Sequence, residues 1–146
     1  MSLSFMNAEN KITIKSVTLD DAALPLVIYG AIGNPSPEKV LEVIGSYKNP
    51  DHAIIGAFVG DIFAGILGIY KTSEVLTIRH INVLINYQKE GIGTLLLDYI
   101  KKCYEGCKII AETDSESVDF YAKSGFTFHA FKGQYGNLRY KCEFNR

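Results

Sequence analysis

The stretch VLTIRHINVLINYQKEGIGTLLLDYIKKC (Val75–Cys103) changes its hydrophobic period near its middle. Its first part, up to Leu84, is an apolar run rich in β-branched residues, which is typical of a strand. From Ile92 onward the apolar residues fall at helical spacing, which indicates a helix with a broad apolar face over residues 92 to about 105. A short polar loop at 86–90 joins the two parts. The stretch therefore predicts a strand, a loop and a helix in direct succession.

Two glycines, Gly91 and Gly93, stand at the start of this helix. Glycine loses more conformational freedom on folding than any other residue, so a pair of glycines at a helix start needs a reason. A helix N-terminus presents backbone N–H groups without intrahelical partners and the positive end of the helix dipole, and both attract anions. Because glycines remove the side chains that would keep a phosphate away from those donors, the pattern predicts a phosphate-binding loop.

Two familiar phosphate loops fit this stretch poorly. A P-loop requires Gly-Lys-Ser/Thr, but Gly93 is followed directly by Thr94. A dinucleotide-binding fingerprint requires a third glycine where Leu96 stands, although an acidic residue does lie about 20 positions further on, at Glu112 or Asp114. The antiparallel strands predicted upstream are also wrong for a doubly wound parallel sheet.

The rest of the chain predicts an α/β domain. Two apolar runs, 53–59 and 62–70, are joined by Gly60-Asp61, a two-residue hairpin signal. Ser36-Pro37 is a good helix start, with an N-cap followed by proline at the first helical position. We expect a mixed, mostly antiparallel sheet of about seven strands, flanked by helices, with one strand–helix–strand crossover near its middle. The predicted strands are 12–17, 53–59, 62–70, 75–84, 108–113, 126–132 and 138–144.

Length and charge limit the class of protein. The chain has 146 residues, the size of one domain, which we take as residues 1–146. Fifteen Lys and Arg against sixteen Asp and Glu give a net charge of −1, which argues against nucleic acid or a membrane surface as the main partner. With no membrane-length apolar run and no signal-peptide layout, a cytoplasmic protein is expected. Residues 1–5 precede a second methionine, Met6, and are interpreted as a cloning remnant or a disordered end.

The cysteines do not indicate a metal site. Cys103 and Cys107 lie four residues apart near the end of a predicted helix, without a histidine or a further cysteine beside them to complete a zinc site. We therefore expect reduced thiols and no metal.

Three segments of the sequence resemble motifs of one protein family. Gln88-x-x-Gly91-x-Gly93 resembles the Q/R-x-x-G-x-G/A loop of the GCN5-related N-acetyltransferases (GNAT), whose backbone grips the pyrophosphate of acetyl-CoA. IRHINV (Ile78–Val83) is similar to the strand that runs along the pantetheine arm in that family, and AETDSESVDFYAKSGF (Ala111–Phe126) to its second motif. The resemblance implies acetyl-CoA as co-substrate. The residues that it assigns to cofactor binding are Ile81, Asn82, Val83, Gln88, Lys89, Glu90, Gly91, Ile92, Gly93 and Thr94.

Two positions in the loop depart from the family pattern. Family members often carry a further glycine where Lys89 stands and a basic or polar residue where Glu90 stands. A carboxylate at Glu90 would repel a nearby pyrophosphate, although a carboxylate also suits a helix N-terminus.

The resemblance further implies transfer of an acetyl group to a primary amine of a small molecule or a peptide. The family assigns Tyr121 as the acid that protonates the departing thiolate, while a core aromatic is the alternative for this residue. Glu112 and His80 are candidate bases that would deprotonate the amine, an ion pair or a satisfied sheet histidine being the alternatives. A CoA-binding sensor without catalysis, a nucleotide-binding or interaction module, and a homodimer stay open.

Overall fold

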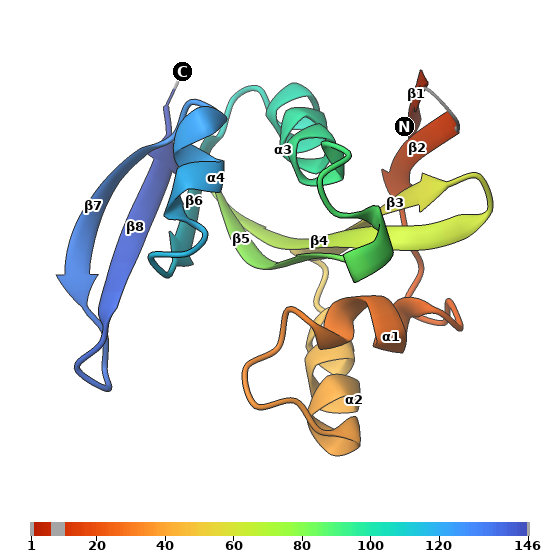
Figure 1. The fold of residues 1–146 in the computed structure, drawn as a ribbon, viewed down its shortest axis with the longest axis horizontal. Helices are drawn as coiled ribbons and strands as arrows, with labels where there is room; N and C mark the ends of the chain where they lie inside the picture. Colours follow the sequence, from red (N-terminus) through yellow and green to blue (C-terminus); the bar gives the residue numbers. More distant parts are fainter. Residues whose placement is uncertain (1, 7–10, 146) are drawn as a thin grey trace.

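The computed structural model describes residues 2–6 and 11–145, which form one eight-stranded sheet with helices on both faces (Figure 1). The strand order is β1-β2-β3-β4-β5-β6-β8-β7, and every neighbouring pair is antiparallel except β5–β6. The strands are β1 (Ser2–Met6), β2 (Lys11–Ser16), β3 (His52–Val59), β4 (Ile62–Thr72), β5 (Val75–Val83), β6 (Lys108–Thr113), β7 (Thr127–Lys132) and β8 (Leu138–Phe144). The helices are α1 (Leu24–Tyr29), α2 (Pro37–Ser46), α3 (Ile92–Cys103) and α4 (Val118–Lys123), with a short 3-10 turn, η1 (Ile85–Tyr87).

Local signals in the sequence account for the ends of several elements. α2 begins as predicted, because the Ser36 hydroxyl accepts a hydrogen bond of 3.1 Å from the Lys39 backbone N–H and Pro37 occupies the first helical position. The β3–β4 hairpin turns at Gly60, whose φ of +59° lies in the left-handed region. These boundaries depend on neighbours in the chain, which is why the sequence predicts them.

The strand number differs from the prediction of about seven. Ser2–Met6 forms the additional edge strand β1, which pairs antiparallel with β2, and Leu3 and Phe5 pack against the main core. An alternation of two apolar residues over so short a segment is a weak signal. The pairing with β2 completes the strand through backbone hydrogen bonds that no local pattern reveals.

Two apolar cores lie on opposite faces of the sheet. α3 and α4 cover one face, and the core beneath them includes Leu96, Leu97 and Ile109. α1 and α2 cover the other face, where Leu24, Val27 and Ile66 are buried (Figure 1). Within the described ranges, none of the helices combines the length and the apolar character required to cross a bilayer.

The parallel strands β5 and β6 stay together only at their beginnings. Their pairing runs from Val75 opposite Lys108 to Thr77 opposite Ile110, and β5 then continues to Val83 without β6 beside it. On its other edge β5 remains paired with β4 through Val83, with an irregularity at which Arg79 is the extra residue between Ile78 and His80. The two strands therefore diverge in a V-shaped opening beyond Thr77 and Ile110. The strand–helix–strand crossover predicted from the sequence, β5–α3–β6, is confirmed.

Candidate active site

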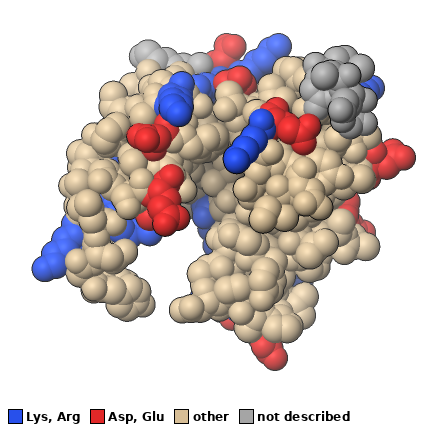
Figure 2. All heavy atoms as spheres, viewed as in Figure 1, with Lys and Arg blue, Asp and Glu red and all other residues tan. Residues whose placement is uncertain are grey.

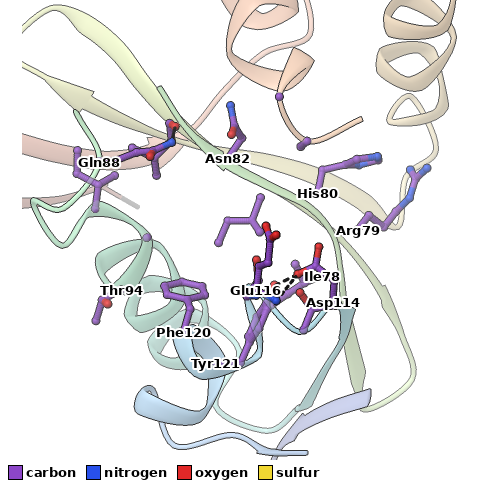
Figure 3. A pocket seen from close by; sticks show the side chains of 18 of the residues that line it. Ile78, Arg79, His80, Asn82, Gln88, Thr94, Asp114, Glu116, Phe120 and Tyr121 are labelled. Carbon is purple, nitrogen blue, oxygen red and sulfur yellow. Dashed lines mark hydrogen bonds between the residues drawn. The ribbon is translucent and has the colours of Figure 1, made fainter. Parts of the chain in front are cut away.

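A cleft of about 710 Å³ occupies the opening between β5 and β6. Every predicted site residue except Glu90 lines it, including Tyr121, Glu112 and His80. In Figure 2 the molecule is hollowed between two lobes, and both acidic and basic atoms are visible along the walls. Figure 3 shows Gln88 and Thr94 at one end of the cleft and Arg79 and His80 at the other. Glu90 is exposed and lies outside the cleft.

The loop before α3 is held in a conformation that opens the helix end toward the cleft. Gly91 has a φ of +79°, and a Cβ atom added there would meet no heavy atom within 4 Å. The first intrahelical bond runs from the Leu95 N–H to the Gly91 carbonyl at 3.0 Å, so the N–H groups before Leu95 have no partner within the helix. Lys89 also has a positive φ, +68°, which explains why a glycine would suit that position. The Gln88 amide donates to the Val83 carbonyl at 2.9 Å and ties the loop to β5.

The two glycines serve different purposes. Open space surrounds the Cβ position at Gly91, as a phosphate cradle would need. At Gly93, by contrast, a Cβ would lie 3.0 Å from Cε1 of Phe120. The absence of a side chain at Gly93 thus lets an aromatic ring of α4 approach α3, a contact that the loop sequence alone does not predict.

The free edge of β5 offers backbone groups to the cleft. At Ile81, Asn82 and Val83 the strand pairs with β4 on one edge, while the β5–β6 ladder has already ended at Thr77. The Asn82 side-chain amide donates to the Val27 carbonyl of α1 at 3.0 Å and so fixes α1 on the sheet. The main chain of Asn82 lies on the strand edge that β6 leaves unpaired.

Tyr121 lies on α4 with its ring in the core and lines the cleft. It is only 3% exposed and packs edge-on against Phe120 and Phe126. Burial raises the pKa of the Tyr121 phenol well above its usual value of 10.0, so the hydroxyl is protonated over the whole neutral range. It can donate a proton but cannot act as a resting base.

His80 is joined to α2 by a short hydrogen bond. Its Nδ1 lies 2.6 Å from the hydroxyl of Tyr47, a buried residue just beyond α2. Burial, reinforced by the charge of Arg79, lowers the pKa of His80 to about 4, so the ring is neutral at pH 7. Burial also raises the pKa of the Tyr47 phenol, which therefore keeps its proton, so the hydrogen bond joins two neutral groups. In the tautomer in which Tyr47 donates to Nδ1, the ring proton lies on Nε2 and His80 can act as a hydrogen-bond donor to a ligand.

Three carboxylates line the opposite wall. Asp114 accepts hydrogen bonds from the backbone N–H groups of Glu116 and Ser117, at 3.1 and 3.0 Å, and so caps the entry to α4. Glu112 and Glu116 are exposed at the cleft wall. Glu116 and the two cleft arginines, Arg79 and Arg139, are not among the residues predicted from the sequence. The sequence pointed to the nearby His80 as a candidate base and to Asp114 as a possible acidic residue of a dinucleotide fingerprint, but only the folded chain shows which side chains reach the cleft.

Comparisons with known proteins match the chain to acetyltransferases. A family model described as the acetyltransferase (GNAT) domain matches residues 35–139. An uncharacterized N-acetyltransferase of Staphylococcus saprophyticus is 33% identical over 88 residues, which cover 53% of this chain and 59% of that relative. The chain thus spans less than two thirds of the length of this curated relative.

Solved structures share the whole architecture. A GNAT family acetyltransferase from Elizabethkingia anophelis, determined with acetyl-CoA bound, has a TM-score of 0.71 at 21% identity, covering 94% of this chain and 99% of that one. An acetyltransferase from Thermus thermophilus has a TM-score of 0.74 at 18% identity, covering 91% and 96%. At these identities the likeness establishes the fold alone.

Proposed function

The chain belongs to the GNAT acetyltransferase family, and from this premise we propose that it transfers an acetyl group from acetyl-CoA directly to a primary amine of a small molecule or a peptide. The observation that carries the proposal is the juxtaposition of two features in one cleft. An open helix N-terminus lies at one end, and an unpaired strand edge leads from it to a buried, protonated phenol.

We propose that the cofactor lies along this cleft. The N–H groups at the start of α3, from Gly91 to Thr94, would hold the pyrophosphate, since backbone donors and the helix dipole both favour negative charge. The main chain of Ile81 to Val83 would hydrogen-bond the amides of the pantetheine arm, as an added strand does at a sheet edge. The space beside Gly91 supports this fit, because a phosphate can approach the backbone there.

The bound co-substrate supplies a thioester whose acetyl carbon forms a bond to the amine nitrogen while its bond to sulfur breaks. In our proposal Tyr121 gives its phenolic proton to the departing sulfur and regains one from solvent. Glu112, exposed at the cleft wall, takes the proton that the amine must lose, directly or through a water molecule. Neutral His80 orients the acceptor through an Nε2 proton, in the tautomer in which Tyr47 donates to Nδ1.

Two measurements test the proposal. Acetyl-CoA at 100 times its dissociation constant should stabilise the fold by about 2.7 kcal/mol, which corresponds to about 5–10 °C in Tm for a domain of this size. NADH should give little shift. Release of free CoA should then depend on an added amine, in a screen of polyamines, amino acids, aminoglycosides and peptides.

The outcomes separate three kinds of protein. Stabilisation together with amine-dependent CoA release supports an acetyltransferase. Stabilisation without turnover on any amine would instead indicate a sensor that binds CoA without catalysis. If acetyl-CoA does not bind at all, the loop serves another anion or a protein partner.

A further inference from the structure

Two arginines line the cleft without a carboxylate partner. Arg79 comes from β5 and Arg139 from β8, and both side chains are half-buried. The ion pairs among the described residues are His52–Asp51, Lys101–Asp98 and Lys108–Glu143, and neither arginine takes part in them. A guanidinium has five N–H donors and keeps its charge at any physiological pH. Two such groups, partly withdrawn from water and unpaired in one cleft, favour an anionic ligand.

Arg79 is held in place before any ligand arrives. As the extra residue of the irregularity in β5, it projects toward α2, where Nη1 donates to the Ser46 hydroxyl at 2.9 Å. Its guanidinium carbon lies 4.7 Å from the ring centroid of Tyr47. One of the five donors is thus used, and the others stay available. A fixed guanidinium loses little side-chain entropy when it binds an anion.

Arg139 approaches from the other arm of the V. The position of a Cβ on Gly133, in the β7–β8 turn, is 3.1 Å from Arg139 Cδ, so the aliphatic part of the side chain lies against that turn. On β8 it directly precedes Tyr140, which pairs with Thr113 at the end of β6. Arg139 and Arg79 therefore reach the cleft from its two sides, far from each other in the sequence.

These donors lie away from the predicted phosphate loop. Figure 3 shows Arg79 and His80 at the opposite end of the cleft from Gln88 and Thr94. The cofactor phosphates therefore do not account for Arg79. In the tautomer in which Tyr47 donates to Nδ1, His80 Nε2 is a further donor at this end. The carboxylates of Glu112 and Glu116 line the same cleft and suit the ammonium form of an amine.

We infer that the acceptor is an amine that also carries an anionic group, a carboxylate or a phosphate, which Arg79 and Arg139 bind while the amine faces Glu112 and Glu116. Guanidinium groups match both anions by paired hydrogen bonds, so the shared chemistry is an acidic amine. This inference rests on the proposed acetyl transfer and narrows its substrate class.

Matched acceptors test the inference. We would measure kcat/KM for leucine against isoamylamine, for β-alanine against propylamine, and for phosphoethanolamine against ethanolamine, all at saturating acetyl-CoA. The acidic member of at least one pair should be favoured by about 10- to 100-fold, the effect of a charge-assisted hydrogen bond. Preference in the first two pairs identifies a carboxylate, and preference in the third identifies a phosphate.

Variants then assign the preference to the arginines. Arg139→Gln should lower the ratio of acidic to neutral acceptor by about tenfold, and Arg139→Lys by less, because charge is kept but the paired geometry is lost. Arg79→Gln should lower the same ratio, with Tm recorded because it also loses the contact with Tyr47. Lys141→Gln is the matched control on β8, because Lys141 is exposed, lies outside the cleft and sits over the Phe131 ring. It should leave the ratio unchanged.

The possible failures are distinct. If the protein acetylates neutral amines as well as their acidic counterparts, the inference is overturned and the proposed acetyl transfer stands. A preference for acidic amines that survives Arg139→Gln and Arg79→Gln, or that Lys141→Gln removes equally, also overturns the role of the two arginines. If no amine in either class is acetylated while acetyl-CoA binds, the proposed function fails and the inference fails with it.

Discussion

Replacing Gly91 by alanine separates the cost of a left-handed backbone from the loss of an anion site, because the chain contains a matched control. Gly91 and Gly60 have φ values of +79° and +59°, and a Cβ at either position would meet no heavy atom within 4 Å. Neither substitution creates a clash, so each should cost only the backbone strain of an L-residue in this region, about 1–2 kcal/mol. For a domain of this size each variant should lose about 2–8 °C in Tm.

The two variants should differ in ligand binding. Only Gly91 precedes α3 in the cleft, whereas Gly60 lies in the β3–β4 turn outside it. A Cβ at Gly91 enters the space that we assign to the pyrophosphate and should remove at least one charge-assisted bond, about 1.5–3 kcal/mol. Calorimetry should therefore show an acetyl-CoA Kd about 10- to 150-fold weaker for Gly91→Ala. The Kd of Gly60→Ala should equal that of the wild type.

One result would refute the reasoning. If Gly91→Ala loses as much stability as Gly60→Ala but binds acetyl-CoA as tightly as the wild type, the phosphates do not lie at the start of α3. A larger substitution, Gly91→Val, should abolish the acetyl-CoA shift in Tm, and its retention would lead to the same conclusion.

Three further predictions concern single side chains. Tyr121→Phe keeps the buried ring but loses the phenolic proton, so kcat should fall by about 10²–10⁴-fold at nearly constant acetyl-CoA Kd. The control Tyr140→Phe, outside the cleft, should keep full kcat. Full activity of Tyr121→Phe would exclude the residue as the acid. Glu90→Gln, at an exposed position outside the cleft, should tighten acetyl-CoA binding by less than about threefold, and only at low salt; a large change by calorimetry would mean that Glu90 faces the pyrophosphate. Burial and the charge of Arg79 lower the pKa of His80 from 6.5 to about 4, so between about pH 4 and pH 6.5 the unfolded chain binds more protons at His80 than the folded chain does. The contribution of neutral His80 to the free energy of unfolding is therefore complete above pH 6.5 and is lost as the pH falls to about 4. Urea unfolding at several pH values should show a steeper loss of stability in acid for the wild type than for His80→Gln, and parallel curves would contradict the partly buried, neutral state of His80.

Interactions between residues close in the chain made many of the strands and helices predictable from the sequence. The β6 strand and the Pro37 start of α2 are confirmed within the structure at the predicted residues, because strand alternation and helix caps depend on close neighbours in the chain. The loop from Gln88 to Gly93 is equally local, and the structure brings it into the cleft with the other predicted site residues except Glu90. The short edge strand β1 fell outside these signals, because it is defined by its pairing with β2.

What the sequence by itself determined is the succession of the main strands and helices after β1, the phosphate-type loop at a helix start and the family resemblance that follows from them. The tertiary structure alone decided how distant side chains meet. Tyr47 reaches His80 across 33 positions, the Asn82 amide ties down α1 across 55, and Phe120 of α4 occupies the space that Gly93 leaves on α3. It also brought the unpaired Arg79 and Arg139 to one cleft. Such contacts depend on how the elements pack and where β5 and β6 part, and packing between distant segments leaves no periodic trace in the chain.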